Sequence, residues 1–183
     1  CKGPNVMQGY YKDPELTQEV MQGDYFKTGD IGTLDEEGFL KITDRKKQMF
    51  KTSGGKYIAP QVIENELKQS VFIEQILVIG EGKNMAAAII QPCFEEAKHW
   101  MDGLGISCKD DVESICENES LLEKINSEIR LHDEKFGKWE KVKVIRLTPD
   151  IWSIEEGHLT PTMKVKRKVV IDKYQTLIDD IYK

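Results

Sequence analysis

Long apolar runs are missing from this sequence, although apolar residues fill 39% of its 183 positions. A helix needs about 20 consecutive, mostly apolar residues to cross a bilayer, and no stretch here is that long. The chain begins at Cys1 and continues as KGPNVMQGYY, a stretch rich in turn-forming residues. We therefore expect no membrane span, no signal peptide and a chain that is a piece of a longer polypeptide.

Cysteine and histidine are scarce, and their spacings match no zinc ribbon, zinc finger or redox CxxC pattern. The residues concerned are Cys1, Cys93, Cys108, Cys116, His99, His132 and His158. Nothing marks a secreted disulfide scaffold, so we expect reduced thiols and a cytoplasmic protein. We also expect no metal site, and we interpret His132 as a partly buried packing residue of a helix.

An excess of positive charge is missing too. Charged residues make up 32% of the chain, and the net charge is −6. A protein that binds nucleic acid needs clustered excess lysine and arginine to neutralise phosphates, so we expect no nucleic-acid partner. The apolar content suffices for a real core. The length fits one domain of ordinary size, or one domain with a piece of another.

Residues 1–43 are rich in glycine, proline, aspartate and aromatic residues. The run Phe39–Ile42 alternates apolar and polar residues, as a half-buried strand does. The preceding stretch Asp35–Gly38 is a turn signal. We therefore expect this first part of the chain to consist of β-hairpins and loops.

The rest of the chain alternates strand and helix patterns. Strands are predicted at 73–80, 85–91 and 142–147, and helices from Pro60, over 93–102, from a capping box at Ser120–Glu123 and from Arg167. The nearly continuous apolar run at 85–91 predicts a central strand, and residues 103–119 and 155–162 are expected to form loops. This order of elements predicts an α+β domain with a mixed or antiparallel sheet and helices packed on it.

The stretch FKTSGGKYIAP, residues 50–60, looks at first like a phosphate-binding loop. A nucleotide P-loop needs a glycine five residues before its Gly-Lys pair and a serine or threonine after the lysine. Phe50 and Tyr57 occupy those two positions, so we reject the P-loop interpretation. Two adjacent glycines between a basic strand and Pro60 then need another explanation.

Three separated motifs carry a family resemblance. They are YFKTGD at 25–30, DRKKQM at 44–49 followed by SGGK at 53–56, and LTPTMK at 159–164 followed by VKR at 165–167. With the opening KGPNVMQGYYKDPELT, they resemble the C-terminal part of the adenylate-forming enzymes, which include acyl-CoA synthetases, luciferases and peptide-synthetase adenylation domains. The resemblance covers nearly the whole chain. The tail TPTMKVKRKVVIDKYQTLIDDIY, the Asp-Arg-x-Lys linker and the helical insert around 93–136 are most similar to long-chain fatty-acid–CoA ligases.

The resemblance implies roles for three residues. Asp30 would accept hydrogen bonds from the ribose hydroxyls of the nucleotide, and Arg45 would help to hold the same nucleotide. Lys164 resembles the adenylation lysine, whose ammonium group would neutralise charge on the attacking carboxylate and on the α-phosphate. From the residues alone, an aspartate in a plain turn and a lysine at a solvated, basic helix start remain alternatives.

The resemblance also explains the glycine pair. It implies that a C-terminal domain swivels between two reaction steps, and that Ser53, Gly54 and Gly55 then face the pantetheine arm of coenzyme A. The hinge would lie between Asp44 and Lys47. The expected organisation is the β-rich end of an N-terminal domain at 1–43, a linker at 44–49 and a mobile C-terminal lid at 50–183.

The implied function is the joining of a fatty acid to coenzyme A with ATP, through an acyl-adenylate, with release of AMP and pyrophosphate. ATP would bind with Mg, whose ligands are expected in the N-terminal domain, the expected protein partner. The isolated chain is expected to be inactive, because the phosphate loop and acyl tunnel are expected in that domain too. Another acid-activating enzyme of the superfamily and a non-catalytic partner-binding module stay open as alternatives. A peripheral membrane contact of the cytoplasmic protein stays open as well.

Overall fold

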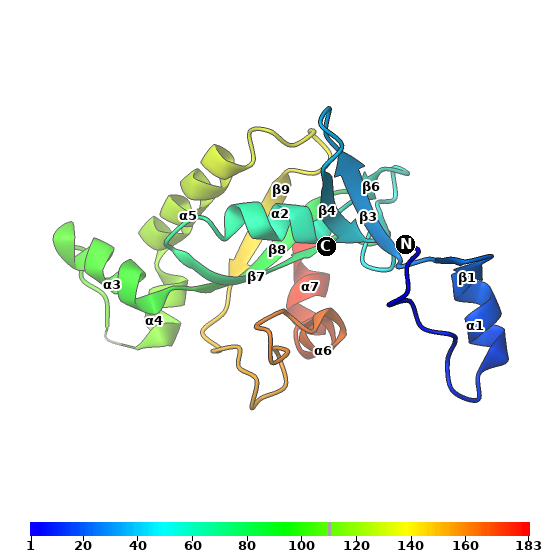
Figure 1. Ribbon diagram of the computed structural model, residues 1–183. Coiled ribbons are helices and arrows are strands. Elements are labelled where there is room, and N and C mark those ends of the chain that lie inside the picture. The colour runs from blue at the N-terminus through cyan, green and yellow to red at the C-terminus, as the bar shows by residue number, and fades with distance from the viewer. Residues whose placement is uncertain (110) are drawn as a thin grey trace. The chain divides into compact units, whose positions relative to one another are not determined.

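The computed structural model describes residues 1–109 and 111–183, and the side chain of Asp44 lies outside the described part. The chain divides into two compact units, residues 1–48 and residues 49–183 (Figure 1). Each unit is described by itself below.

The first unit contains a helix and two hairpins in its described part. The helix α1 spans Pro14–Val20, β1 (Met21–Gln22) pairs antiparallel with β2 (Tyr25–Phe26), and β3 (Asp30–Leu34) pairs antiparallel with β4 (Leu40–Arg45). The sequence predicts only hairpins and loops here, so α1 corrects that prediction. Its start has a clear local cause, because Asp13 Oδ1 accepts a hydrogen bond from the Leu16 N–H at 3.0 Å and Pro14 occupies the first helical turn.

The second unit starts with a short hairpin and a helix. The strands β5 (Phe50–Lys51) and β6 (Tyr57–Ile58) pair antiparallel. The helix α2 follows directly as Pro60–Leu67, with proline in its first turn as predicted. Pro60, Ile63 and Leu67 bury one face of α2, which fixes this helix against the sheet.

A mixed three-stranded sheet forms the centre of the second unit. Its strands are β7 (Ile73–Ile79), β8 (Ala86–Pro92) and β9 (Val142–Leu147), in the order β7-β8-β9. The pair β7–β8 is antiparallel and the pair β8–β9 is parallel. The prediction of a central strand at 85–91 is confirmed, because every residue of β8 is buried.

Further helices complete the unit: α3 (Phe94–Gly103), α4 (Val112–Glu117), α5 (Glu119–His132), α6 (Arg167–Lys173) and α7 (Gln175–Ile181). The helix α4 corrects the predicted loop at 103–119. The start of α5 corrects the predicted cap at Ser120, because Asn118 Oδ1 accepts a hydrogen bond from the Leu121 N–H at 3.1 Å. Asparagine is as good a cap as serine, and it lies two residues earlier. His132 is half-buried at the end of α5, as expected.

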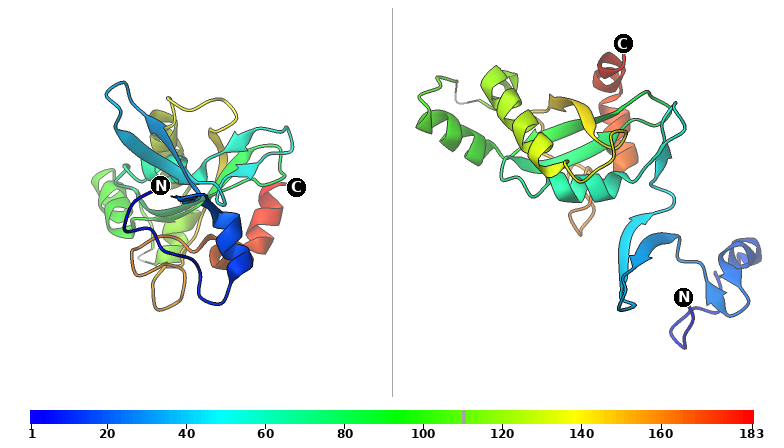
Figure 2. Two further views of the ribbon diagram at one scale, coloured as in Figure 1. Left: turned by 45° about the vertical axis from the view of Figure 1, so that its right-hand side comes forward. Right: turned by 90° about the horizontal axis from the view of Figure 1, so that it is seen from above.

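Two hydrophobic cores lie on the two faces of the sheet. One core joins the sheet to α2, α3, α4 and α5, and the other joins it to α6, α7 and the segment that precedes α6. In the view of Figure 1, α2 lies above β7 and β8, and α6 and α7 lie below them; Figure 2 shows the same elements from two further directions. Because neighbouring residues of a strand point to opposite faces, Leu77 and Val78 belong to different cores. The α+β class with a mixed sheet and packed helices is confirmed.

Candidate functional site

Asp30 and Arg45 face each other across the hairpin of the first unit. Asp30 opens β3, Arg45 ends β4, and the antiparallel register pairs the two residues directly. Arg45 Nε lies 3.2 Å from Asp30 Oδ1, and the side chains are 66% and 25% exposed, respectively. The structure therefore brings together the two predicted nucleotide-binding residues as an ion pair accessible to solvent.

The turn before Asp30 depends on its glycine. Gly29 has a φ of +75°, in the left-handed region that side chains disfavour. The Asp30 N–H donates to Thr28 Oγ1 at 3.1 Å, and the Lys46 N–H donates to the Gly29 carbonyl at 2.8 Å. These bonds hold the start of β3 against the end of β4. The Thr-Gly-Asp sequence thus presents the carboxylate beside the guanidinium.

Lys164 lies on a second hairpin, which we call the lysine hairpin, residues 158–166. The Lys166 N–H donates to the His158 carbonyl at 2.8 Å, and the Thr160 N–H donates to the Lys164 carbonyl at 2.8 Å. Between these bonds, Leu159 and Val165 form an isolated antiparallel bridge. Lys164 is exposed at the tip. A flexible ammonium group on an exposed tip can reach an anionic ligand outside the unit.

Arg167, directly after the lysine hairpin, has a role that sequence reasoning missed. Its Nη1 donates to Glu64 Oε1 of α2, and its Nη2 donates to the Val78 carbonyl of β7. The same Glu64 oxygen accepts a hydrogen bond from the Val78 N–H at 2.8 Å. These two side chains therefore satisfy both backbone groups of Val78 in β7. No local signal could have revealed a pair 103 residues apart.

Ser53, Gly54 and Gly55 lie in the turn Thr52–Lys56 between β5 and β6, which we call the glycine turn. Gly55 has a φ of +78°, so a side chain there would be strained. Gly54 has no such constraint: in the described part, an added Cβ would have Thr52 Oγ1 as its nearest neighbour, at 4.0 Å. The fold therefore explains the second glycine but not the first.

Exposed aromatic rings with lysines over them flank the glycine turn. Lys51 Nζ lies 5.6 Å from the ring centre of Tyr57, and Lys56 Nζ lies 5.0 Å from that of Trp139. Tyr57 is 62% exposed and Trp139 is 48% exposed. The turn thus lies beside two exposed lysine–aromatic pairs, each stabilised by attraction between the ammonium group and the face of the ring.

The predicted hinge lies beside the boundary between the two units. Lys47 is in the turn that follows β4, where the Gln48 N–H donates to the Arg45 carbonyl at 2.9 Å. In the sequence, the boundary between the two compact units falls between Gln48 and Met49. The hinge at Asp44–Lys47 and its swivel stay predictions.

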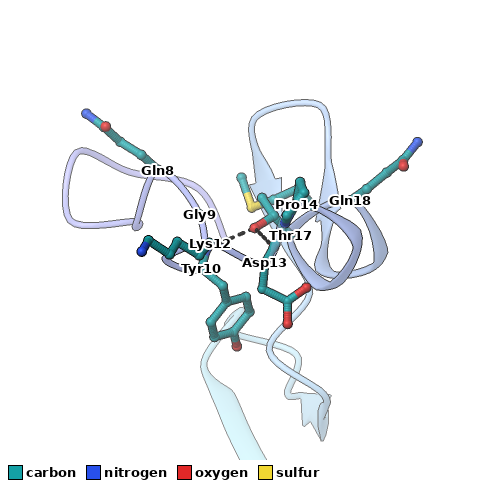
Figure 3. Close-up of a pocket in the computed structure, with 9 residues that line it drawn as sticks. Gln8, Gly9, Tyr10, Lys12, Asp13, Pro14, Thr17 and Gln18 are labelled. Atoms are coloured by element: carbon teal, nitrogen blue, oxygen red, sulfur yellow. Dashed lines mark hydrogen bonds between the residues drawn. The ribbon is translucent and has the colours of Figure 1, made fainter.

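A surface hollow of about 520 Å³ lies elsewhere in the first unit, around the start of α1 (Figure 3). Thr17 Oγ1 accepts a hydrogen bond from the Tyr10 N–H at 2.8 Å and donates one to the Asp13 carbonyl at 2.8 Å. The described residues that line the hollow include none of the predicted site residues. We therefore leave it outside the candidate site.

Within residues 1–109 and 111–183, no group of three or more histidine, cysteine, aspartate or glutamate side chains is arranged to hold a metal ion. No helix of the described part is long and apolar enough to cross a membrane.

Comparison with known families agrees with these features. The sequence profile of the AMP-binding enzyme C-terminal domain matches residues 47–183. The chain therefore belongs to this family, and the resemblance to the C-terminal part of adenylate-forming enzymes is confirmed.

Similar proteins narrow the resemblance. The long-chain-fatty-acid–CoA ligase FadD15 of Mycobacterium tuberculosis is 35% identical over 99% of this chain, and long-chain-fatty-acid–CoA ligase 1 of Homo sapiens is 41% identical over 99% of it. The chain spans 30% and 26% of the lengths of these two relatives. Among solved structures, the A domain of a carboxylic acid reductase from Segniliparus rugosus, in complex with AMP and a co-purified carboxylic acid, superposes with a TM-score of 0.79. It is 25% identical, and the match covers 99% of this chain and 27% of that one.

Proposed function

We propose that this chain is the C-terminal part of a long-chain fatty-acid–CoA ligase. The observation that carries the proposal is its 35–41% identity, over nearly the whole chain, to relatives with that name. The reaction would join a fatty acid to coenzyme A at the expense of ATP. It would pass through an acyl-adenylate and release AMP and pyrophosphate.

In the first half-reaction, Asp30 and Arg45 bind the nucleotide. The carboxylate accepts hydrogen bonds from the ribose hydroxyls, and the guanidinium beside it orients that carboxylate and contacts the nucleotide. Their existing ion pair at 3.2 Å supports this role, because little rearrangement is needed on binding. Lys164 neutralises the charge that develops on the attacking carboxylate and the α-phosphate.

In the second half-reaction, the C-terminal lid swivels at Asp44–Lys47 and turns the glycine turn toward the chemistry. Ser53, Gly54 and Gly55 then border the path of the pantetheine thiol. The open surface at Gly54 supports this assignment, because its lack of a side chain serves no packing need seen in the described part. The tip of the lysine hairpin thus serves the first half-reaction, and the glycine turn serves the second.

The remaining requirements belong to the N-terminal part of such a ligase. Mg would accompany ATP and be bound there, and coenzyme A is the co-substrate. The N-terminal domain is the partner against which the lid moves. We propose a cytoplasmic location and keep a peripheral membrane contact as a further proposal.

The test is made on a full-length protein that carries this chain as its C-terminal part. Incubation with ATP, Mg, palmitate and coenzyme A is expected to yield palmitoyl-CoA, AMP and pyrophosphate. The isolated chain is expected to be silent, because the groups that bring the reactants together are missing from it. Steady product formation by the chain alone, or none by the full-length protein, would overturn the proposal. Activity with a different acid but not with palmitate would favour another acid-activating enzyme of the superfamily.

A further inference from the structure

The lysine hairpin has an exposed tip and a buried base. Lys164 is exposed, whereas His158 is 4% exposed and Leu159 is fully buried in the core shared with α6 and α7. The segment between β9 and α6, which is fully described, contains no helix and no strand of a sheet. The two arms of the hairpin, called its first and second strands below, pair at the isolated bridge between Leu159 and Val165. One backbone bond, from the Leu159 N–H to the Ser153 carbonyl at 3.0 Å, ties the base to the preceding residues. Beyond it, side chains at the base of the hairpin determine where its tip lies.

Lys173 holds the first strand of the hairpin. Its Nζ lies 3.3 Å from His158 Nε2 and 2.9 Å from Asp150 Oδ2. An ammonium group can only donate, so Nε2 accepts and the ring is neutral. Burial first, and the Lys173 charge second, lower the pKa of His158, which agrees with a neutral ring. His158 Nδ1 is buried without a hydrogen-bond partner among the described residues. Burying this unsatisfied group costs free energy, so other contacts must hold the ring in place.

A closed ring of hydrogen bonds fixes Asp150 in turn. The Tyr174 hydroxyl donates to Asp150 Oδ2 at 2.6 Å, and it accepts from Trp152 Nε1 at 3.0 Å. Because its one proton goes to the carboxylate, Thr148 Oγ1 must be the donor at 3.0 Å to Tyr174. Thr148 Oγ1 itself accepts from the Asp150 N–H at 3.2 Å, which closes the ring.

The charges in this ring agree with its geometry. The Tyr174 hydrogen bond is the main reason that the pKa of Asp150 is lowered, and Lys173 adds to it. Burial, followed by the Asp150 hydrogen bond, raises the pKa of Tyr174 to about 12. The carboxylate is therefore ionised and the phenol neutral, which are the states that the ring requires.

Arg167 holds the second strand of the hairpin. It follows Lys166 directly and is anchored to Glu64 of α2 and to the carbonyl of Val78 in β7. The Arg167 and Glu64 side chains are only 18% and 14% exposed. Solvent screens an ion pair so little exposed less than it screens a surface pair, so this pair holds Arg167 in one position more firmly.

We propose that these contacts form a two-sided clamp that positions Lys164 for adenylate formation. Arg167 and Glu64 act on one strand of the lysine hairpin, and Tyr174, Asp150 and Lys173 act on the other through His158. The inference rests on the proposed role of Lys164. None of these five clamp residues is assigned contact with a substrate, so they are positioning residues.

The first test measures the position of the hairpin in the chain itself. Tyr174→Phe removes the hydroxyl at the centre of the hydrogen-bond ring. Tyr182→Phe is its matched control, because the Tyr182 hydroxyl donates to the Met85 carbonyl, at a distance of 3.1 Å, and has no part in the hairpin. Glu64→Gln breaks the second strand's ion pair. Its control is Glu66→Gln, which breaks the Lys135 ion pair on the same helix.

Amide hydrogen exchange reports the result. The amides of Thr160 and Lys166 close the hairpin, and the loss of one buried partner should speed their exchange about tenfold. The same amides should keep their wild-type rates in the two controls. Unchanged amides in both clamp variants, or equal changes in the controls, would overturn the proposal. Should Tyr174→Phe fail to fold, Lys173→Gln replaces it, at a side chain that is 37% exposed.

The second test separates the half-reactions in the full-length ligase. A misplacement of about 1 Å can cost up to 10²-fold in rate, so both clamp variants should slow adenylate formation by about tenfold or more. Thioester formation from supplied acyl-adenylate should stay within about twofold of wild type. Equal loss in both steps, or in neither, would overturn the clamp. An inactive wild-type ligase would instead overturn the proposed function, and the exchange result would still stand.

Discussion

The glycine turn and the tip of the lysine hairpin share one hydrogen-bond pattern despite unlike sequences, Thr52–Lys56 (TSGGK) and Thr160–Lys164 (TPTMK). In each, the threonine N–H donates to the lysine carbonyl, at 2.9 and 2.8 Å, respectively. The lysine N–H donates back to the threonine Oγ1, at 3.2 and 3.1 Å. The fourth residue has a positive φ in both, +78° at Gly55 and +59° at Met163.

The two turns differ in how they are attached to the unit. The glycine turn is held by backbone bonds, from the Ser53 N–H to the Lys83 carbonyl and from the Gly82 N–H to the Lys51 carbonyl, both at 2.8 Å. The lysine hairpin has one such bond to the residues before it, from the Leu159 N–H to the Ser153 carbonyl at 3.0 Å. Its attachments to more distant parts of the chain are made by side chains, those of the clamp and the buried Leu159. Backbone bonds survive most substitutions, whereas a side-chain clamp can be released by one. One fold can therefore hold two turns that share a hydrogen-bond pattern but differ in how strongly a substitution outside the turn displaces them.

The largest effect is expected from Lys164→Ala in the full-length ligase. Removing one electrostatic partner of a developing charge typically costs on the order of 10²–10³ in rate. The rate of adenylate formation, measured by pyrophosphate exchange, should fall by about that factor. Thioester formation from supplied adenylate should survive. Lys168→Ala, at an exposed lysine of the same basic stretch, is the control. Equal loss in both steps would mean that Lys164 has a structural role.

The shared threonines should show opposite effects. Thr160→Val removes the oxygen that accepts from the Lys164 N–H, and Thr52→Val removes its counterpart in the glycine turn. We expect the first to slow adenylate formation and the second to slow thioester formation, each by about tenfold. Serine at either position should restore the rate, because it keeps the hydroxyl. The same pattern of loss in both valine variants would contradict separate roles for the turns.

The two glycines should differ in stability when changed to alanine. Gly55→Ala puts a side chain at a φ of +78°, which costs about 1–2 kcal/mol of unfolding free energy. Gly54→Ala should change it by less than about 0.5 kcal/mol, because that position is open. Urea unfolding of the chain measures both. Equal losses at the two positions would show that the turn has been described wrongly.

The smallest effect is a pH dependence that involves the lysine hairpin. The pKa of His158 in the folded chain lies below its ordinary value, chiefly because the ring is buried. As the pH falls below about 6.5, the unfolded chain takes up a proton that the folded chain refuses, so the folded state loses stability. The variant His158→Gln should lose less stability over that range in urea unfolding. An unchanged pH profile would remove His158 as the cause.

Local patterns predicted much of the second unit. The strands at 73–79, 86–92 and 142–147 follow from continuous or alternating apolar residues, and Pro60 marks the start of α2. The misses have local causes as well. The short helices α1 and α4 begin at aspartate caps, which the turn-like composition of their surroundings concealed.

The site was only partly predictable from the sequence. The resemblance indicated Asp30 and Arg45 separately, and only strand register shows that they face each other. The likeness of the two turns is hidden because Met163 occupies the position that glycine takes in the other turn. The clamp joins residues far apart in the chain, and single-sequence patterns carry no information on such pairs.

The central claim is that each turn serves one half-reaction, and Gly54→Leu in the full-length ligase tests it most directly. The backbone at Gly54 needs no positive φ, and an added Cβ has room there, so the variant should fold. The leucine should block the path of pantetheine only when the glycine turn faces the chemistry. We predict wild-type pyrophosphate exchange and a slowed release of thioester from supplied acyl-adenylate. Wild-type rates in both steps of a stably folded variant would contradict the claim.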